Sequence, residues 1–249
     1  MRIDVHFNGS STGGQAELHD RVVLVIDVLR ASTSIAAALN NGARAVIPFQ
    51  GVDEAMTRAR SLERSDVLLA GERRMVPIRG FDLGNSPREF TPAIVQGKTI
   101  VMTTTNGTAA LAGAHGAHEV LVGSFANYSV VVAWLRAAAR ADKSLTLVCA
   151  GTDGRFALED AVCAGRFVRG IARRGIEAEL GDAAKIAAMI DRRMGEDLHL
   201  VLRDSEHGRA LIEAGHGDDV AYCATLDTNP VVPIYRDRQV VKLGDERVR

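Results

Sequence analysis

The stretch VVLVIDVLRASTSIAAALNNG, residues 22–42, decides the fold. Val22 to Asp27 is a continuous apolar run ended by an acid, which is typical of a strand buried on both faces of a parallel sheet. Ser32 to Asn41 is Ala-rich with helical spacing, and Asn41-Gly42 marks its end. A polar cluster therefore falls where a strand gives way to a helix, and this order predicts a strand–helix–strand unit.

The same order recurs along the chain. Further strands are expected at 2–7, 45–49, 67–70, 99–103, 119–122 and 145–150, and helices at 52–63, 107–114, 127–140 and 159–174. Residues 181–223 are expected to be mostly helical with breaks at Gly195, Gly208 and Gly215, and residues 231–235 and 239–243 to form a closing hairpin. The alternation predicts a three-layer α/β/α fold with a mostly parallel sheet. We expect one unit over 1–249, with two similar lobes, about 1–125 and 126–249, and the site between them as a variant.

Composition narrows the possible partners. Hydrophobic residues make up 47% of the chain and aromatic residues only 4%, so Ala, Val, Leu and Ile must fill the core. The net charge of −1 offers no basic field for a polyanion, which argues against nucleic acid. No apolar run reaches the ~18–20 residues needed to span a bilayer, and the N-terminus has no apolar signal core. We therefore expect a cytoplasmic protein that does not contact a membrane.

Polar clusters at strand ends are the places to look for chemistry, because open α/β sheets bind ligands at the carboxyl ends of their strands. In the first cluster, Asp27 can hold a hard cation and Arg30 offers a planar fork of donors to phosphate. Ser32 and Thr33 sit at the expected helix start, where backbone N–H groups attract anions. Plain helix capping would explain the hydroxyl residues, but it does not explain an arginine beside the acid.

Two later clusters follow the same logic. The threonine-rich turn after the strand at 99–103 supplies neutral donors and a close backbone approach from Thr104, Thr105, Asn106, Gly107 and Thr108. The adjacent acids Glu159 and Asp160 begin a helix, where negative charge is favourable in itself. Neighbouring helical residues point in different directions, so we expect one of these two acids, rather than both, to face a shared metal.

The irregular segment 71–90 is long for a compact domain, and loops of this kind are more often functional than idle. It combines flexible glycines with the polar residues Glu72, Arg73, Asp82, Asn85 and Ser86. A solvated loop is the alternative.

Thiol chemistry is a rival hypothesis. Cys149 and Arg155 stand at C-x5-R spacing near a strand end, but neither flanking position has the residue that a thiolate phosphatase loop would favour. The seven histidines show no metal-binding spacing, and we interpret them as surface or satisfied side chains.

Taken in order, six motifs resemble the 2-phosphosulfolactate phosphatase family over roughly residues 20–170. They are residues 25–33, Gly71-Glu72-Arg73, residues 80–87, residues 103–108, residues 123–127 with Asn127, and Cys149-Ala150-Gly151 through Glu159-Asp160. A weaker match continues around Ser205 and His207-Gly208. One departure is Arg74-Met75, where the family often has glycines.

This resemblance implies an α/β enzyme that uses Mg²⁺ to hydrolyse (2R)-2-phospho-3-sulfolactate to 3-sulfolactate and phosphate in coenzyme M biosynthesis. We expect Asp27 and one of Glu159 or Asp160 to bind Mg²⁺, with Arg30 neutralising charge on the phosphoryl group. Arg73, Asn85 and Ser86 are candidates to read the sulfonate and carboxylate. Direct water attack and a phosphoenzyme at Asp27 or Cys149 both stay open, as does a homodimer. Two other classes are a non-catalytic binding protein for a small anion and a nucleotide-dependent α/β enzyme, although no G-x-G-x-x-G follows a strand and Gly13-Gly14 precedes one.

Overall fold

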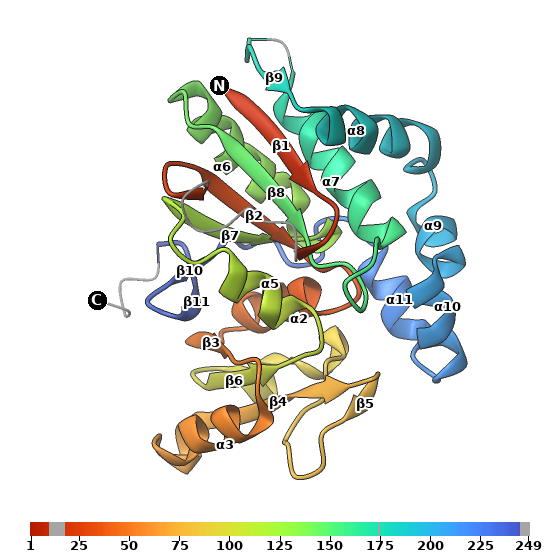
Figure 1. Ribbon diagram of the computed structural model, residues 1–249. Coiled ribbons are helices and arrows are strands. Elements are labelled where there is room, and N and C mark those ends of the chain that lie inside the picture. The colour runs from red at the N-terminus through yellow and green to blue at the C-terminus, as the bar shows by residue number, and fades with distance from the viewer. Residues whose placement is uncertain (10–17, 174, 245–249) are drawn as a thin grey trace.

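The computed structural model describes residues 1–9, 18–173 and 175–244, and these form an α/β fold (Figure 1). The expected glycines at 13 and 14 and the end of the expected helix at 174 lie outside the described residues. The strands are β1 (Arg2–His6), β2 (Val22–Ile26), β3 (Ala45–Pro48), β4 (Val67–Arg73), β5 (Val76–Pro77), β6 (Thr99–Thr103), β7 (Glu119–Gly123), β8 (Leu145–Cys149), β9 (Glu179–Leu180), β10 (Pro233–Arg236) and β11 (Gln239–Lys242). The α-helices are α2 (Ala31–Asn40), α3 (Val52–Arg60), α4 (Pro92–Val95), α5 (Gly107–Gly113), α6 (Tyr128–Arg140), α7 (Leu158–Ile171), α8 (Asp182–Met194), α9 (Leu198–Asp204), α10 (Glu206–Glu213) and α11 (Gly217–Cys223).

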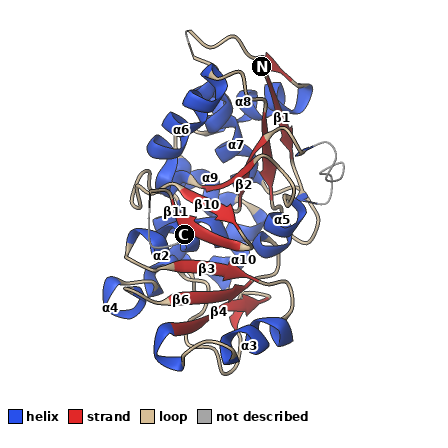
Figure 2. Ribbon diagram, turned by 90° about the vertical axis from the view of Figure 1, so that its left-hand side faces the viewer, coloured by secondary structure: helices blue, strands red, loops and turns tan. Residues whose placement is uncertain are grey.

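The described strands form one sheet in the order β5-β4-β6-β3-β11-β10-β7-β2-β8-β1-β9. Parallel pairing joins β4, β6 and β3 in one block and β7, β2, β8, β1 and β9 in the other. The antiparallel hairpin β10–β11 lies between the blocks, which confirms the predicted closing hairpin, and its turn is at Asp237-Arg238. Figure 2 shows β3, β6 and β4 below β1 and β2, with this hairpin between them.

Strand β2 is buried along its whole length because helices cover both of its faces. Leu24 and Ile26 pack in one core with residues of α6, α7 and α8, including Phe167. Val23 and Val25 pack in a second core with α2 and α5, including Ile35. The near-continuous apolar run thus serves two layers at once, and the predicted three-layer α/β/α architecture with a mostly parallel sheet is confirmed.

The irregular segment holds more structure than expected. Strand β4 continues through Gly71 to Arg73 and turns back into β5, so the first part of segment 71–90 is a β-hairpin. The turn residues Arg74 and Met75 both have positive φ, at 51° and 67°. Gly208 does not break a helix as predicted but lies inside α10, where an added Cβ would sit 1.7 Å from the carbonyl oxygen of Leu202. The prediction of a break failed because that glycine permits close helix packing.

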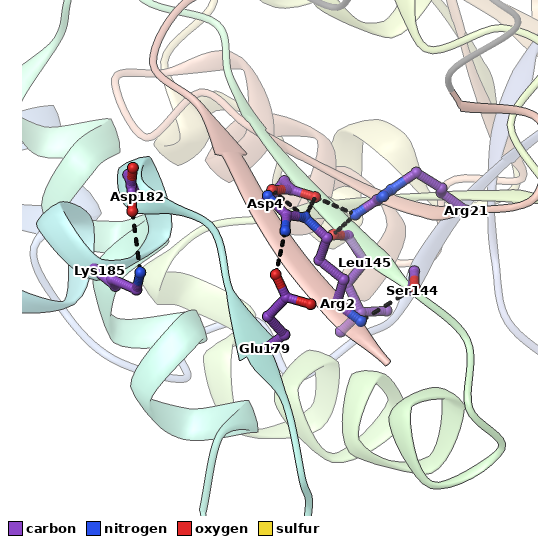
Figure 3. A network of polar contacts seen from close by, with 8 residues as sticks. All are labelled: Arg2, Asp4, Arg21, Ser144, Leu145, Glu179, Asp182 and Lys185. Carbon is purple, nitrogen blue, oxygen red and sulfur yellow. Dashed lines mark hydrogen bonds and ion pairs between the residues drawn. The ribbon is translucent and has the colours of Figure 1, made fainter.

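A polar network fastens β1 where it and β8 begin (Figure 3). Asp4 accepts hydrogen bonds from Arg2 and from Arg21, whose Nη2 is 2.7 Å away, and Arg2 also donates to Glu179 in β9. These ion pairs lie at the amino ends of the parallel strands, at the opposite edge of the sheet from their carboxyl ends. In the described part of the chain, no helix has both the length and the apolar character needed to cross a bilayer.

Candidate active site

Two crossover helices bring the strand ends of the two blocks together. Helix α2 leads from β2 to β3, and α5 leads back from β6 to β7. A Cβ added to Gly107, the first residue of α5, would lie 2.6 Å from the Cβ of Ala31 and 2.6 Å from Oδ2 of Asp27. Only glycine allows this approach, so the threonine-rich turn after β6 is held directly against the acid that follows β2.

A cavity of about 1000 Å³ lies at this junction. It is lined by nine of the residues singled out in the sequence, namely Asp27, Arg30, Glu72, Arg73, Asn85, Thr104, Thr105, Asn106 and Glu159. They come from the ends of β2, β4, β6 and β8 and from the segment around Asn85, so groups far apart in the chain share one space. His207, Arg74, Arg155 and Arg209 also line it.

Asp27 is buried, and its side chain holds the start of α2. Its Oδ1 accepts a hydrogen bond from the Ala31 N–H at 3.1 Å, and its own N–H donates to Oγ of Ser32 at 2.9 Å. Burial raises the pKa of Asp27 to about 6, and the negative charges of Glu72 and Glu159 add to this. The opposing effects, from the charge of His207 and the Ala31 N–H, are smaller.

Glu159, in the first turn of α7, faces His207, in the first turn of α10. Glu159 is 2% exposed, and its Oε1 lies 3.7 Å from Nδ1 of His207. Burial alone would lower the pKa of His207, but the nearby carboxylates of Glu159 and Asp27 outweigh burial and raise it. Ser205 caps α10 by accepting the N–H of Gly208 at 3.0 Å, which fixes the turn that carries His207.

Asp160 has a different role from Glu159. Its Oδ1 accepts the Val28 N–H at 2.9 Å and its Oδ2 accepts the Gly151 N–H at 3.1 Å, so it ties the end of β2 to the end of β8. Burial, with the charges of Glu159 and Asp27, raises its pKa well above the ordinary value. It does not line the cavity. Of the predicted pair, Glu159 alone therefore faces the shared space.

Arg30 is fixed by a buried ion pair. Its Nη1 donates to Oδ2 of Asp219 in α11 at 2.7 Å, and Oδ1 of Asp219 accepts a hydrogen bond from Oγ of Ser86 at 2.6 Å. Arg30 and Asp219 are 4% and 2% exposed, so truncating one of them would leave a buried charge without its partner. A guanidinium has five N–H donors, and those not used by Asp219 remain for an anion in the cavity.

Asn85 contributes a buried amide without a protein partner. The residue is 5% exposed, and its Oδ1 has no hydrogen-bond partner among the described residues. The Asn85 main chain, by contrast, accepts a hydrogen bond from Oγ of Ser34 at 2.8 Å. Buried polar atoms are almost always satisfied, so an unpaired amide oxygen at a cavity wall points to a hydrogen-bond donor that the cavity receives.

The β4–β5 hairpin forms one wall. Glu72 accepts hydrogen bonds from the N–H groups of Met75, at 2.7 Å, and Thr105, at 3.1 Å. Arg73 faces the cavity, but its guanidinium donates to the carbonyl oxygens of Glu72 and Gln50 and to Thr103 Oγ1. Its donors are thus largely committed to holding the wall, and it is a weaker candidate for reading a sulfonate than its sequence position indicates.

Seven predicted substrate contacts do not line the cavity: Ser32, Thr33, Asp82, Ser86, Gly107, Thr108 and Asn127. Ser86 is instead bonded to Asp219. The carboxylate of Asp82 holds Arg64 and the Leu69 N–H, and Asn127 bonds the main chain at Ser124, Val122 and Val231. These side chains shape the loops beside the site because their polar atoms already have partners within the fold.

Comparison with protein-family models matches residues 10–238 to 2-phosphosulpholactate phosphatase. The chain belongs to the 2-phosphosulpholactate phosphatase family. A probable 2-phosphosulfolactate phosphatase of Symbiobacterium thermophilum is 42% identical over 227 residues, covering 91% of this chain and 96% of the relative. Proteins of the same printed name from Thermotoga petrophila and Caldanaerobacter subterraneus are 40% and 38% identical, over 86% and 87% of this chain and 88% of each relative. The resemblance seen in the sequence is confirmed, and with it the class of phosphoric monoester hydrolase.

Thiolate chemistry does not fit this member of the 2-phosphosulpholactate phosphatase family. Cys149 is fully buried within β8 and does not line the cavity. Burial, with the nearby charge of Asp160, raises the pKa of the Cys149 thiol well above its ordinary value. A nucleophilic cysteine needs a lowered pKa and access to substrate, so the burial of Cys149 argues against it as the nucleophile.

Four residues of this phosphatase site were missed in the sequence. His207 was interpreted with the other histidines as a surface or satisfied side chain, although Ser205 and His207-Gly208 form one of the weaker family matches. Asp219 lies in none of the motifs that the sequence analysis singled out. Arg155 was considered only as the arginine of the C-x5-R spacing, and Arg74 only as a departure from the family pattern.

The carboxylates present suit Mg²⁺ as a two-ligand site. Within the described residues, no group of three or more His, Cys, Asp and Glu side chains is placed to hold a metal ion. Mg²⁺, however, is often bound through one or two carboxylates plus water and substrate phosphate. Asp27 and Glu159 are buried at one cavity, and the charge of Glu159 adds to the raised pKa of Asp27, so a cation between them would offset that repulsion.

Proposed function

We propose that this chain is a Mg²⁺-dependent phosphatase that hydrolyses (2R)-2-phospho-3-sulfolactate, or a closely related phosphorylated hydroxy acid, to 3-sulfolactate and phosphate. One water is consumed: its oxygen bonds to phosphorus while the bond between phosphorus and the C2 oxygen breaks. Family membership and the printed names of the relatives support the reaction class. The observation that carries the proposal is the shared cavity, where a buried arginine faces two buried carboxylates from different strand ends.

Asp27 and Glu159 would hold the metal ion. When bound, Mg²⁺ would polarise the phosphoryl oxygens and neutralise part of the substrate's negative charge. Asp160 would support this arrangement from behind by fixing the main chain of Val28 and Gly151. Its two oxygens are occupied by those N–H groups, which leaves Glu159 as the ligand from α7.

Arg30 would bind the transferred phosphoryl group. Charge on the equatorial oxygens is the main feature that an enzyme stabilises in phosphoryl transfer, and a fixed guanidinium provides oriented donors for it. Asp219 and Ser86 keep Arg30 in place before substrate arrives. The unpaired Oδ1 of Asn85 is an acceptor, so it would orient the attacking water rather than bind the anionic oxygens of the substrate.

His207 would supply the proton for the leaving C2 oxygen. An alkoxide is a poor leaving group, so protonation by a positioned acid accelerates its departure by a typical 10²- to 10⁴-fold. The contact with Glu159 is at Nδ1, which leaves Nε2 as the nitrogen that would carry the proton to the leaving oxygen. The proton moves from Nε2 to the C2 oxygen as the bond to phosphorus breaks.

A phosphate-release screen tests this proposal and separates it from the two rival classes. The purified chain is assayed with and without Mg²⁺ on phosphosulfolactate, other phosphorylated hydroxy acids and ATP. We expect Mg²⁺-dependent release with phosphosulfolactate among the best substrates. Tight binding of these anions without turnover would indicate a non-catalytic binding protein, and release from ATP alone would indicate a nucleotide-dependent enzyme.

A further inference from the structure

The turn between β4 and β5 has a residue choice that the fold itself disfavours. Glu72 pairs with Pro77 and Arg73 with Val76, which leaves Arg74 and Met75 as a two-residue hairpin loop. Both residues have positive φ, at 51° and 67°. Such loops favour Asn-Gly or Gly-Gly because those residues adopt this conformation at little cost, whereas arginine is strained there.

The Arg74 side chain lines the cavity, and it is exposed. Among the described residues, no carboxylate lies within ion-pair distance of its guanidinium, and no hydrogen bond to it occurs within the fold. Glu72, the nearest acid in the chain, already accepts the N–H groups of Met75 and Thr105. The Arg74 side chain therefore makes no polar contact within the fold that would offset the strained backbone. Its guanidinium is left for a ligand in the cavity.

Arg155 ends a turn, residues 152–155, that is bonded to the threonine-rich loop. Thr152 and Arg155 exchange main-chain hydrogen bonds of 3.1 and 2.9 Å around Asp153 and Gly154, which fixes the backbone of Arg155. The Asp153 N–H donates to Oδ1 of Asn106 at 3.2 Å. The exposed guanidinium of Arg155 also has no ion-pair partner among the described residues.

These contacts place the two turns around one loop. The β4–β5 hairpin is bonded to that loop through Glu72 and Thr105, and the 152–155 turn is bonded to it through Asn106. Both arginines thus line one cavity, from turns that are bonded to the same loop. Deeper in the site, Arg30 is fixed by Asp219, and Arg73 is committed to main-chain oxygens and Thr103.

The cavity rim also carries acidic side chains, whose negative charges act on any bound ligand. Asp153, Asp204 and Glu206 are exposed at the cavity, and Asp204 pairs with Arg203. Asp204 also neighbours Arg209, whose Nη1 donates to the Asp204 carbonyl oxygen. Arg74 and Arg155 are consequently the rim cations most available to a bound anion.

We propose that Arg74 and Arg155 form a subsite for a second, permanently charged anionic group of the substrate, the sulfonate, while the phosphoryl group lies deeper at Arg30. This subsite rests on the proposed function, and it makes Arg74 and Arg155 specificity residues for phosphomonoesters that carry a second strong acid. A guanidinium bonds sulfonate oxygens as it bonds phosphate oxygens, through oriented N–H donors.

Arg74→Asn gives the sharpest test, because asparagine suits the positive-φ turn and removes the charge. We expect this variant to melt at a higher temperature than the native chain. Losing a charge-assisted hydrogen bond should raise KM for 2-phospho-3-sulfolactate about 10- to 100-fold. The rise should exceed any rise for 2-phospholactate, which lacks the sulfonate, by at least about tenfold. Arg155→Gln should shift the same ratio, and Arg74→Lys should restore part of it.

Arg140→Gln is the matched control, since Arg140 is an exposed arginine at the end of α6 that does not line the cavity. It should leave both KM values and their ratio as in the native chain. Equal losses on both substrates in Arg74→Asn and Arg155→Gln, or no loss on either, would overturn the subsite.

Calorimetric titration with 3-sulfolactate and with lactate, in Mg²⁺, separates this inference from the proposed function. If the native chain released no phosphate from either ester, the proposed function would fail. Selective weakening of 3-sulfolactate binding by Arg74→Asn would still support the subsite. Unchanged binding in that variant would refute it.

Discussion

The Asp27→Asn substitution should stabilise the metal-free protein at neutral pH while removing its activity. Burial raises the pKa of Asp27 from 3.8 to about 6. Because the folded-state pKa is raised, the folded chain binds a proton more tightly than the unfolded chain, and stability is lost as pH rises from about 4 to above 6. The difference of about two pKa units corresponds to a cost of about 3 kcal/mol above that range, and asparagine does not ionise.

The hydrogen-bonding geometry of the site makes asparagine a close replacement. Its amide oxygen can accept the Ala31 N–H as Oδ1 of Asp27 does. The variant should therefore exceed the native chain in stability by about 1 kcal/mol near pH 4.5 and by about 3 kcal/mol near pH 7.5. For a chain of this size the larger value corresponds to a rise in Tm of about 6 to 12 °C.

Thermal unfolding in EDTA across this pH range measures the effect, and a phosphate assay at pH 7.5 measures activity. Asp237→Asn is the control, because Asp237 is exposed in the β10–β11 turn with a φ of 49° that asparagine also accepts. It should show no pH-dependent gain. Mg²⁺ should stabilise the native chain more than Asp27→Asn, since a ligand stabilises only the state that binds it. A gain that does not depend on pH, or a variant that retains full phosphatase activity, would refute the reasoning.

Three further substitutions test the other parts of the site. Arg30→Lys should lower kcat at least about tenfold, because a point charge cannot keep the bond to Asp219 and also present a planar fork to phosphate. A kcat near the native value in steady-state kinetics would argue against a role of Arg30 in phosphoryl binding. His207→Gln should lower kcat about 10²- to 10⁴-fold for alkyl phosphates but much less for 4-nitrophenyl phosphate, whose leaving group needs no proton; equal losses on both esters would argue against a general acid. Cys149→Ser should keep kcat within about threefold in the same assay, and its complete inactivation with the fold intact would restore the thiolate hypothesis.

Local elements were predictable because their signals are local. The apolar run ending at Asp27 and the Ala-rich segment after it predict β2 and α2 to within about one residue. The order of strands was not predictable in this way. The hairpin β10–β11, close to the C-terminus, pairs with β7 on one side and β3 on the other, and only long-range packing decides this insertion.

The candidate site was predictable in outline and not in detail. The rule that ligands bind at the carboxyl ends of strands places Asp27, the threonine-rich turn and Glu159 together, and the structure does the same. That rule does not predict the direction in which a side chain points. Asp160 and Asn127 turn towards main-chain groups, and the motif that contains each of them says nothing of this direction.

His207 and Asp219 show a second limit. Both lie in short helices after the main α/β alternation, so no strand end predicts them. The arrangement of Ser205, His207 and Gly208 was the available signal: a cap, a titratable side chain and a glycine that permits close helix packing. Asp219 needed its contact with Arg30 to be recognised.

A crystal structure of the chain grown with Mg²⁺, 3-sulfolactate and phosphate tests most directly whether the separate strand ends act as one catalytic site. Our account predicts phosphate in hydrogen-bond contact with Arg30, the metal ion between Asp27 and Glu159, and the sulfonate towards Arg74 and Arg155. Products bound instead in the second hollow beside Arg58 and Arg238, with the cavity at Asp27 holding only water, would contradict it.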